Sequence, residues 1–136
     1  MSNVKIASRR EADLVPFLEL NDYEVESIGD NIIRVQKEEE LPVYISINNA
    51  NMYFEVDLGN VSSFASQDMY FQLLDMNTEV LPVSFGINNS NPEDPRLVLV
   101  ESRETGDLND QELLAVFDAL ELAVDKAEGL LSGFMK

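Results

Sequence analysis

Two neighbouring stretches of strict alternation constrain the fold of this chain more than any other feature. Between residues 43 and 58, every second residue is apolar in two runs, which the segment Asn49-Ala50-Asn51 separates. The alternating apolar positions are Val43, Ile45, Ile47, Met52, Phe54, Val56 and Leu58. Successive side chains of a β-strand point to opposite faces of the sheet. The pattern therefore predicts an antiparallel pair with one buried face and one face toward water.

Other strands are predicted on both sides of that pair. Tyr23–Ile28 and Asn31–Gln36 flank Gly29-Asp30, whose composition favours a tight turn. Further along the chain, Val80–Ile87 and Leu97–Val100 have the length and the apolar content of strands. Together these segments predict a sheet of about six strands.

The first predicted helix covers Ser8–Leu20. Ser8 and Glu11 have the spacing of a capping box, in which a side chain at each position satisfies a backbone N–H of the other. Pro16 conflicts with a continuous helix because it lacks an N–H. Either the helix is kinked there, or it restarts near Asp13 and places the proline in its first turn.

Two further helices are predicted, the first capped by Ser66 and the second by Asn109, with Glu112 completing a capping box. The residues expected on one face of the first are Met69, Tyr70, Leu73, Leu74 and Asn77. The apolar arc of the second is formed by Leu113, Val116, Phe117, Leu120, Ala123, Val124, Ala127, Leu130 and Leu131. Opposite that arc lie Asp118, Glu121, Asp125 and Glu128. This last helix should end near Gly129 or Gly133.

The predicted order of elements is α-β-β-β-β-α-β-β-α. Helices that cover one face of an antiparallel sheet make an α+β sandwich of two layers. A chain of 136 residues is of ordinary size for one core, so we expect a single domain over residues 1–136.

Composition excludes several functions. The chain has no Cys and no His, so it has no disulfide, no thiolate or imidazole metal ligand and no triad that uses histidine. Nine basic and 26 acidic residues give a net charge of −17, which should repel nucleic acids and anionic membrane surfaces. No apolar run approaches the roughly 20 residues of a membrane-spanning helix. We therefore expect a cytoplasmic protein that does not insert into membranes.

No catalytic, cofactor-binding or metal-binding residue is predicted. Asp107, Asn109 and Asp110 faintly resemble a calcium loop, but Glu112 stands where that loop requires glycine, so a helix start is the better interpretation. Spacing alone leaves two alternatives open. One is an enzyme in which carboxylates bind a metal ion, and the other is an acidic mimic of nucleic acid.

The element order and the acidity are similar to those of type III secretion chaperones, which are small, usually dimeric proteins. The segments Glu40–Tyr44 and Leu74–Ile87 also resemble a bacterial family of uncharacterised proteins, the YjfI-like family, whose genes often neighbour relatives of the phage-shock membrane-stress protein. The resemblance implies a non-catalytic, chaperone-like module that forms homodimers, binds an unknown protein partner and is linked to a membrane-stress system. It implies no cofactor.

A candidate protein interface follows from the strand around Pro82. Proline cannot donate to a β-ladder, so this strand should lie at a sheet edge, where a second copy of the chain could cover it. Tyrosines on the wet face of the sheet are a second indication, because interfaces are enriched in them. The candidate interface residues are Tyr44, Tyr53, Leu81, Val83 and Phe85.

Overall fold

The fold was analysed in a computed structural model, which describes residues 11–48, 50–104 and 108–135. Three helices and six strands follow one another in the predicted order. They are α1 (Glu11–Leu20), β1 (Glu24–Gly29), β2 (Ile32–Gln36), β3 (Val43–Asn48), β4 (Asn51–Gly59), α2 (Gln67–Met76), β5 (Ser84–Asn88), β6 (Arg96–Glu104) and α3 (Asp110–Ser132). The α+β class is confirmed.

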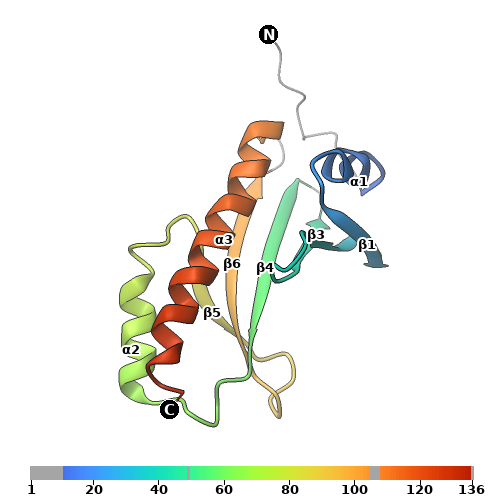
Figure 1. Ribbon diagram of the computed structural model, residues 1–136. Helices are drawn as coiled ribbons and strands as arrows, with labels where there is room; N and C mark the ends of the chain where they lie inside the picture. The colour runs from blue at the N-terminus through green and yellow to red at the C-terminus, as the bar shows by residue number, and fades with distance from the viewer. Residues whose placement is uncertain (1–10, 49, 105–107, 136) are drawn as a thin grey trace.

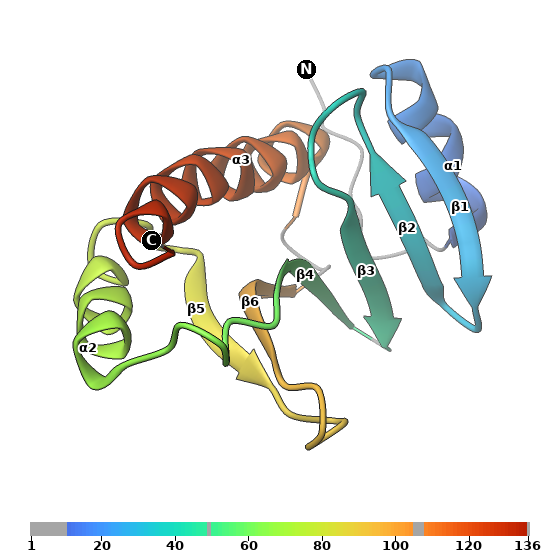
Figure 2. The ribbon, with the colours of Figure 1, turned by 60° about the horizontal axis from the view of Figure 1, so that its bottom comes forward.

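The six strands form one antiparallel sheet in the order β1-β2-β3-β4-β6-β5. The long α3 lies across this sheet, α2 lies beside α3, and α1 lies next to β1 (Figures 1 and 2). β5 is an edge strand, as Pro82 predicted, but it begins only at Ser84. The residues from Val80 to Pro82 form turns instead of the predicted first half of this strand.

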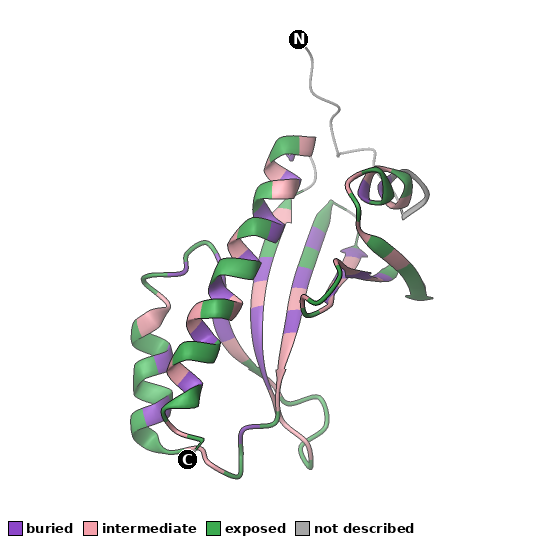
Figure 3. Cartoon of the chain, in the orientation of Figure 1, coloured by how far each residue is buried: buried purple, intermediate pink, exposed green. Residues whose placement is uncertain are grey.

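One face of the sheet carries the core. Alternate residues of β2, β3 and β4 are buried, and the residues between them are not, as the colours along β4 show in Figure 3. Buried side chains of all three helices join the same cluster, among them Leu14 and Leu18 of α1, Met69 and Leu73 of α2, and the apolar arc of α3. The period-2 and helical patterns therefore predicted the inward residues of β3, β4 and α3.

Local differences from the prediction have physical causes. The turn between β1 and β2 contains Asp30 and Asn31 rather than Gly29-Asp30, and a bulge lies between Ser27 and Gly29. Asn31 has a φ of 59°, a left-handed conformation that asparagine tolerates. Pro16 lies inside α1, so the predicted restart near Asp13 is wrong. The capping residue predicted for that helix, Ser8, lies outside the described residues.

The start of α3 is held by the predicted capping box. Asn109 Oδ1 accepts a hydrogen bond from the Glu112 backbone N–H at 2.8 Å, and Glu112 Oε1 accepts one from the Asn109 N–H at 3.1 Å. Arg103 of β6 lies 3.5 Å from Glu112 and 3.4 Å from the buried Glu101. It thereby ties the first turn of α3 to the sheet. The helix ends at the predicted Gly133.

Candidate functional site

A groove of about 200 Å³ lies between α3 and the strands β2, β3 and β4. Its floor is apolar: Val35, Val43 and Val56 of the sheet face Phe117 and Leu120 of α3 across it. These five side chains are all almost fully buried from water.

The rim of the groove is strongly acidic. Glu39 and Glu40 come from the loop between β2 and β3, and α3 contributes a row of acids one turn apart, Glu121, Asp125 and Glu128. Lys37 is the only cation among the lining residues, and its ammonium lies 5.1 Å from the centre of the Tyr23 ring. Five carboxylates therefore face one ammonium.

The pKa values of two groups that line the groove reflect this crowding of acidic side chains. Burial raises the pKa of Glu40, and the side chain of Glu121, which is hydrogen-bonded to it, raises it further. Burial together with the charges of Glu40, Asp118 and Glu121 raises the pKa of Tyr23 to about 12. Both pKa values are raised because burial and the neighbouring acids disfavour a further negative charge in this groove, where positive partners are few.

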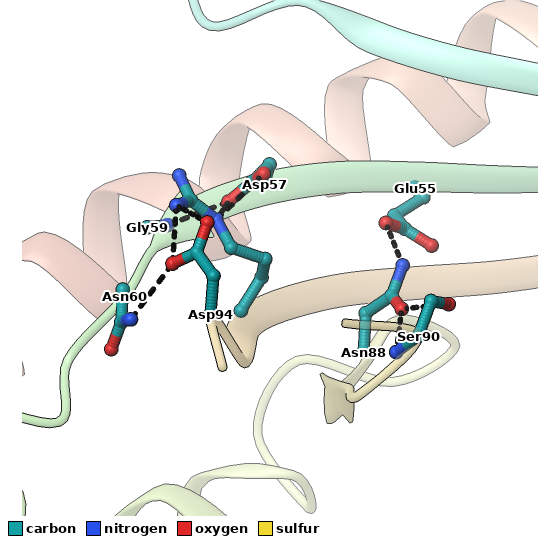
Figure 4. A network of polar contacts seen from close by, with 8 residues as sticks. Glu55, Asp57, Gly59, Asn60, Asn88, Ser90 and Asp94 are labelled. Carbon is teal, nitrogen blue, oxygen red and sulfur yellow. Dashed lines mark hydrogen bonds and ion pairs between the residues drawn. The ribbon is translucent and has the colours of Figure 1, made fainter. Parts of the chain in front are cut away.

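The opposite face of the sheet is covered by none of the three described helices (Figure 1) and holds a second hollow, of about 500 Å³. Tyr53 Oη donates to Glu55 Oε1 at 2.9 Å, and Asn88 Nδ2 donates to Glu55 Oε2 at 3.1 Å. Burial and the hydrogen bond to Glu55 raise the pKa of Tyr53 to about 12. Figure 4 shows the hydrogen bond between Glu55 of β4 and Asn88 of β5, two strands that lie on either side of β6 in the sheet.

A second polar cluster lies near the end of β4. Arg96 donates to both carboxylate oxygens of Asp57 at 3.1 Å and to Asp94 at 3.1 and 3.2 Å. Asn60 donates to the same Asp94 at 2.8 Å (Figure 4). Gly59 follows with a φ of 107°, a conformation that favours glycine. These hydrogen bonds join the end of β4 to the β5–β6 loop, so the cluster holds that loop against the sheet.

Helix α2 has apolar side chains on two sides. Met69 and Leu73 are buried in the core, whereas Tyr70, Phe71 and Leu74 lie on the surface with exposed fractions of 40%, 69% and 66%. The face predicted for this helix is therefore buried only at Met69 and Leu73 and exposed at Tyr70 and Leu74. We call Tyr70, Phe71, Leu74 and the equally exposed Leu81, just beyond the helix, the α2 surface.

The candidate interface residues predicted from the sequence are not brought together. Tyr44 and Tyr53 lie on the face of the sheet that has no helix, half-buried and exposed respectively. Leu81 is exposed at 69%. Val83 and Phe85, in contrast, are buried within this chain, where Phe85 of β5 and Val83 just before that strand join the core cluster. These two side chains are not on the surface of the single chain.

The buried Glu101 was not singled out in the sequence. Its side chain is 2% exposed, and Oε1 has no hydrogen-bond partner among the described residues. Burial raises its pKa, while Arg103 opposes that shift. A lone acid at the end of an apolar stretch is the only signal that could have predicted it.

The metal-dependent alternative requires several carboxylates that converge on one point. Within the described ranges, no three acidic side chains converge in a way that could hold a metal ion. Asn109 and Glu112, which entered the faint calcium pattern, form the helix cap; Asp107 lies outside the described residues. No helix in the described part of the chain combines the length and apolar character needed to cross a bilayer.

Comparison with known proteins identifies the fold. The CesT_Tir_1 family model matches residues 9–136. No functionally curated protein matches the sequence. The finer resemblance to the YjfI-like family stays a prediction.

Three solved structures share the architecture. A chain of the heterodimeric ExoU-SpcU complex from the type III secretion system of Pseudomonas aeruginosa is 22% identical, with a TM-score of 0.69 over 86% of this chain and 96% of that one. YbjN, a putative transcription regulator from E. coli, is 11% identical, with a TM-score of 0.64 over 93% and 96%. The Yersinia pestis type III secretion chaperone SycH, in complex with a fragment of YscM2, is 18% identical, with a TM-score of 0.55 over 85% and 98%. At these identities the likeness establishes the fold alone.

Proposed function

Because the chain belongs to the CesT_Tir_1 family, we propose that it is a non-catalytic, chaperone-like module that binds a protein partner and acts as a homodimer. The observation that carries this proposal is the α2 surface. This short helix has apolar side chains on two sides, and the rest of the chain covers only one of them. The second side needs a partner in water.

A second copy of the chain is the partner that fits the α2 surface. Tyr70, Phe71 and Leu74 follow one another at helical spacing, so the stripe can pack against its own copy around a two-fold axis. Leu81 extends the stripe beyond the helix end. Aromatic side chains at the centre of such a contact supply most of the binding free energy.

Light scattering after size exclusion tests the homodimer. We expect twice the chain mass of 15.3 kDa for the wild type and a single chain for Leu74→Glu, since an unpaired carboxylate would be buried in an apolar contact. A weakening of about 2 kcal/mol or more is expected. The matched control is Leu122→Glu on α3, which introduces the same charge at a leucine of similar exposure. A wild type of 15.3 kDa at tens of micromolar would contradict the homodimer.

The protein partner is the second part of the proposal. Two proteins with this fold are described in complexes with other proteins, ExoU-SpcU and SycH with YscM2. Their fold supports a partner-binding role here without naming the partner. The link to a membrane-stress system has only the sequence resemblance behind it and stays a prediction. Affinity capture from the native host, followed by mass spectrometry, tests both: one stoichiometric protein is expected, and a retained small molecule in its place would contradict the proposal.

A further inference from the structure

We propose that the groove between α3 and strands β2 to β4 binds an apolar segment of the partner protein that carries an arginine or lysine. This inference rests on the proposed function and adds the chemistry of the segment that is bound. Two properties of the groove carry it, its floor and its rim.

The floor favours an apolar or long aliphatic chain. Val35, Val43 and Val56 on the sheet side and Phe117 and Leu120 on the helix side are the buried apolar part of the lining of this groove of about 200 Å³. Val124 of α3 and Leu41 of the loop extend the apolar surface toward the rim, and Leu41 is 38% exposed. The methylene stem of an arginine or lysine packs on such a surface while its charged end stays near water.

The rim determines the charge of the occupant. Glu40 of the loop and Glu121 of α3 both line the groove, and the pKa of Glu40 is raised by burial and by the neighbouring Glu121, so these two acids lie close together where one cation would neutralise both. Asp125 and Glu128 continue the row along α3, one turn apart. A guanidinium placed between the loop and the helix can bond to carboxylates on both sides, whereas an acidic or neutral segment would leave them unpaired.

Among the described residues, only Lys37 brings a cation to the groove. Its ammonium lies over the Tyr23 ring, and its charge lowers the pKa of Glu40 by less than burial and Glu121 raise it. Lys126, the only basic residue in α3, pairs with Glu79 near α2 at 3.8 Å and does not line the groove. The charge imbalance of the groove is therefore left for a partner to neutralise.

Binding of short synthetic peptides, measured by fluorescence anisotropy, tests the inference. The probe alternates leucine with arginine, and a matched peptide has glutamine in place of arginine. We expect the arginine peptide to bind the wild type and the doubly substituted Glu40→Gln, Glu121→Gln variant to bind it about tenfold more weakly. The control variant Glu26→Gln, Glu93→Gln removes the same charge from two exposed positions outside the groove and should bind as the wild type does.

Methyl NMR signals of Leu120 and Val124 locate the peptide directly, and both should shift on binding. Equal weakening in the control variant, equal binding of the glutamine peptide, or no binding of the arginine peptide would each overturn the inference. So would peptide binding that is lost in Leu74→Glu but kept in the groove variant, because this places the site on the α2 surface. None of these results contradicts the homodimer or the captured partner, which light scattering and mass spectrometry test separately.

Discussion

Helices α2 and α3 differ in how they are covered. α3 is 23 residues long, buries one apolar arc against the sheet and turns Asp118, Glu121, Asp125 and Glu128 away from the core. α2 is 10 residues long, buries only Met69 and Leu73 and leaves two aromatic rings and a leucine on the surface. The rest of the chain covers the apolar arc of α3, whereas α2 keeps exposed apolar side chains. An amphipathic pattern thus indicates a helix that folds onto its own core, and apolar residues on two sides of a helix indicate a surface for something else.

The largest expected effect tests whether α3 is the helix that stabilises the single chain. Phe117 is 5% exposed and packs against Tyr23 and, edge to face, against Phe54 with ring centres 4.8 and 6.0 Å away. Phe117→Ala should lower the free energy of unfolding by about 3–5 kcal/mol through lost burial and a cavity. Urea unfolding followed by circular dichroism measures it. A loss below about 1 kcal/mol would mean that α3 is not held as described.

Substitution of the N-cap residues of α2 and α3 should have an effect of intermediate size on stability. Asn109 and Ser66 each accept a backbone hydrogen bond from the residue three positions on, at 2.8 and 3.0 Å. Asn109→Ala and Ser66→Ala should each cost about 1 kcal/mol of unfolding free energy in the same urea experiment. Asn109→Asp, which keeps the acceptor, is the control. Similar losses are expected because the two helices differ in what covers them and not in how they begin.

The pH dependence of stability tests how the first turn of α3 is tied to the sheet. The pKa of Glu101 is raised in the folded chain by burial, so the folded state holds its proton more tightly than the unfolded state does. This contribution to stability is present below the ordinary pKa of the carboxyl and is lost as pH rises through the raised value. Glu101→Gln should therefore gain stability relative to the wild type as pH rises from acid to neutral, by less than a cap contributes. A pH-independent difference between the two proteins would contradict this account.

The smallest expected effect on the unfolding free energy is that of an exposed phenylalanine of α2, for comparison with the buried Phe117 of α3. Phe71 is 69% exposed on α2, so Phe71→Ala should change the unfolding free energy of the single chain by no more than about 0.5 kcal/mol. The measurement uses dilute protein, at which the chain is monomeric, and light scattering at higher concentration shows whether association is weakened. A loss as large as that of Phe117→Ala would mean that Phe71 packs inside the chain, and the contrast between the two helices would disappear.

The sequence predicted the elements well where one face is buried within the chain. The alternation from Val43 to Leu58 and the arc from Leu113 to Leu131 each have a single buried side, and the structure confirms both. The prediction failed on α2, because periodicity cannot distinguish a side covered by the same chain from a side left for another. It also extended β5 back to Val80, where apolar residues are buried in turns instead of a ladder.

The acidic groove could not be predicted from the sequence. Glu39 and Glu40 lie 80 residues from the acids of α3, and only the tertiary fold brings the two groups to one rim. In the sequence, neither the two loop acids nor the acids of α3 can be distinguished from the other solvated acids of an evenly acidic protein. The burial of Val83 and Phe85 had only a partial local signal, since their spacing of two fits one inward face of a strand but Ile87, at the next such position, is 50% exposed.

The strand order has a consequence for synthesis of the protein. β4 pairs on one side with its sequence neighbour β3 and on the other with β6, which lies beyond α2 and β5 in the chain. While a ribosome is still adding residues 60–95, the nascent hairpin of β3 and β4 has an open ladder along nine residues of β4, and Phe54 and Val56 have no α3 above them. Such an intermediate is prone to associate through its edge, and long-range pairing of this kind slows folding. A newly made molecule should therefore depend on rapid completion of its C-terminal third more than on any earlier segment.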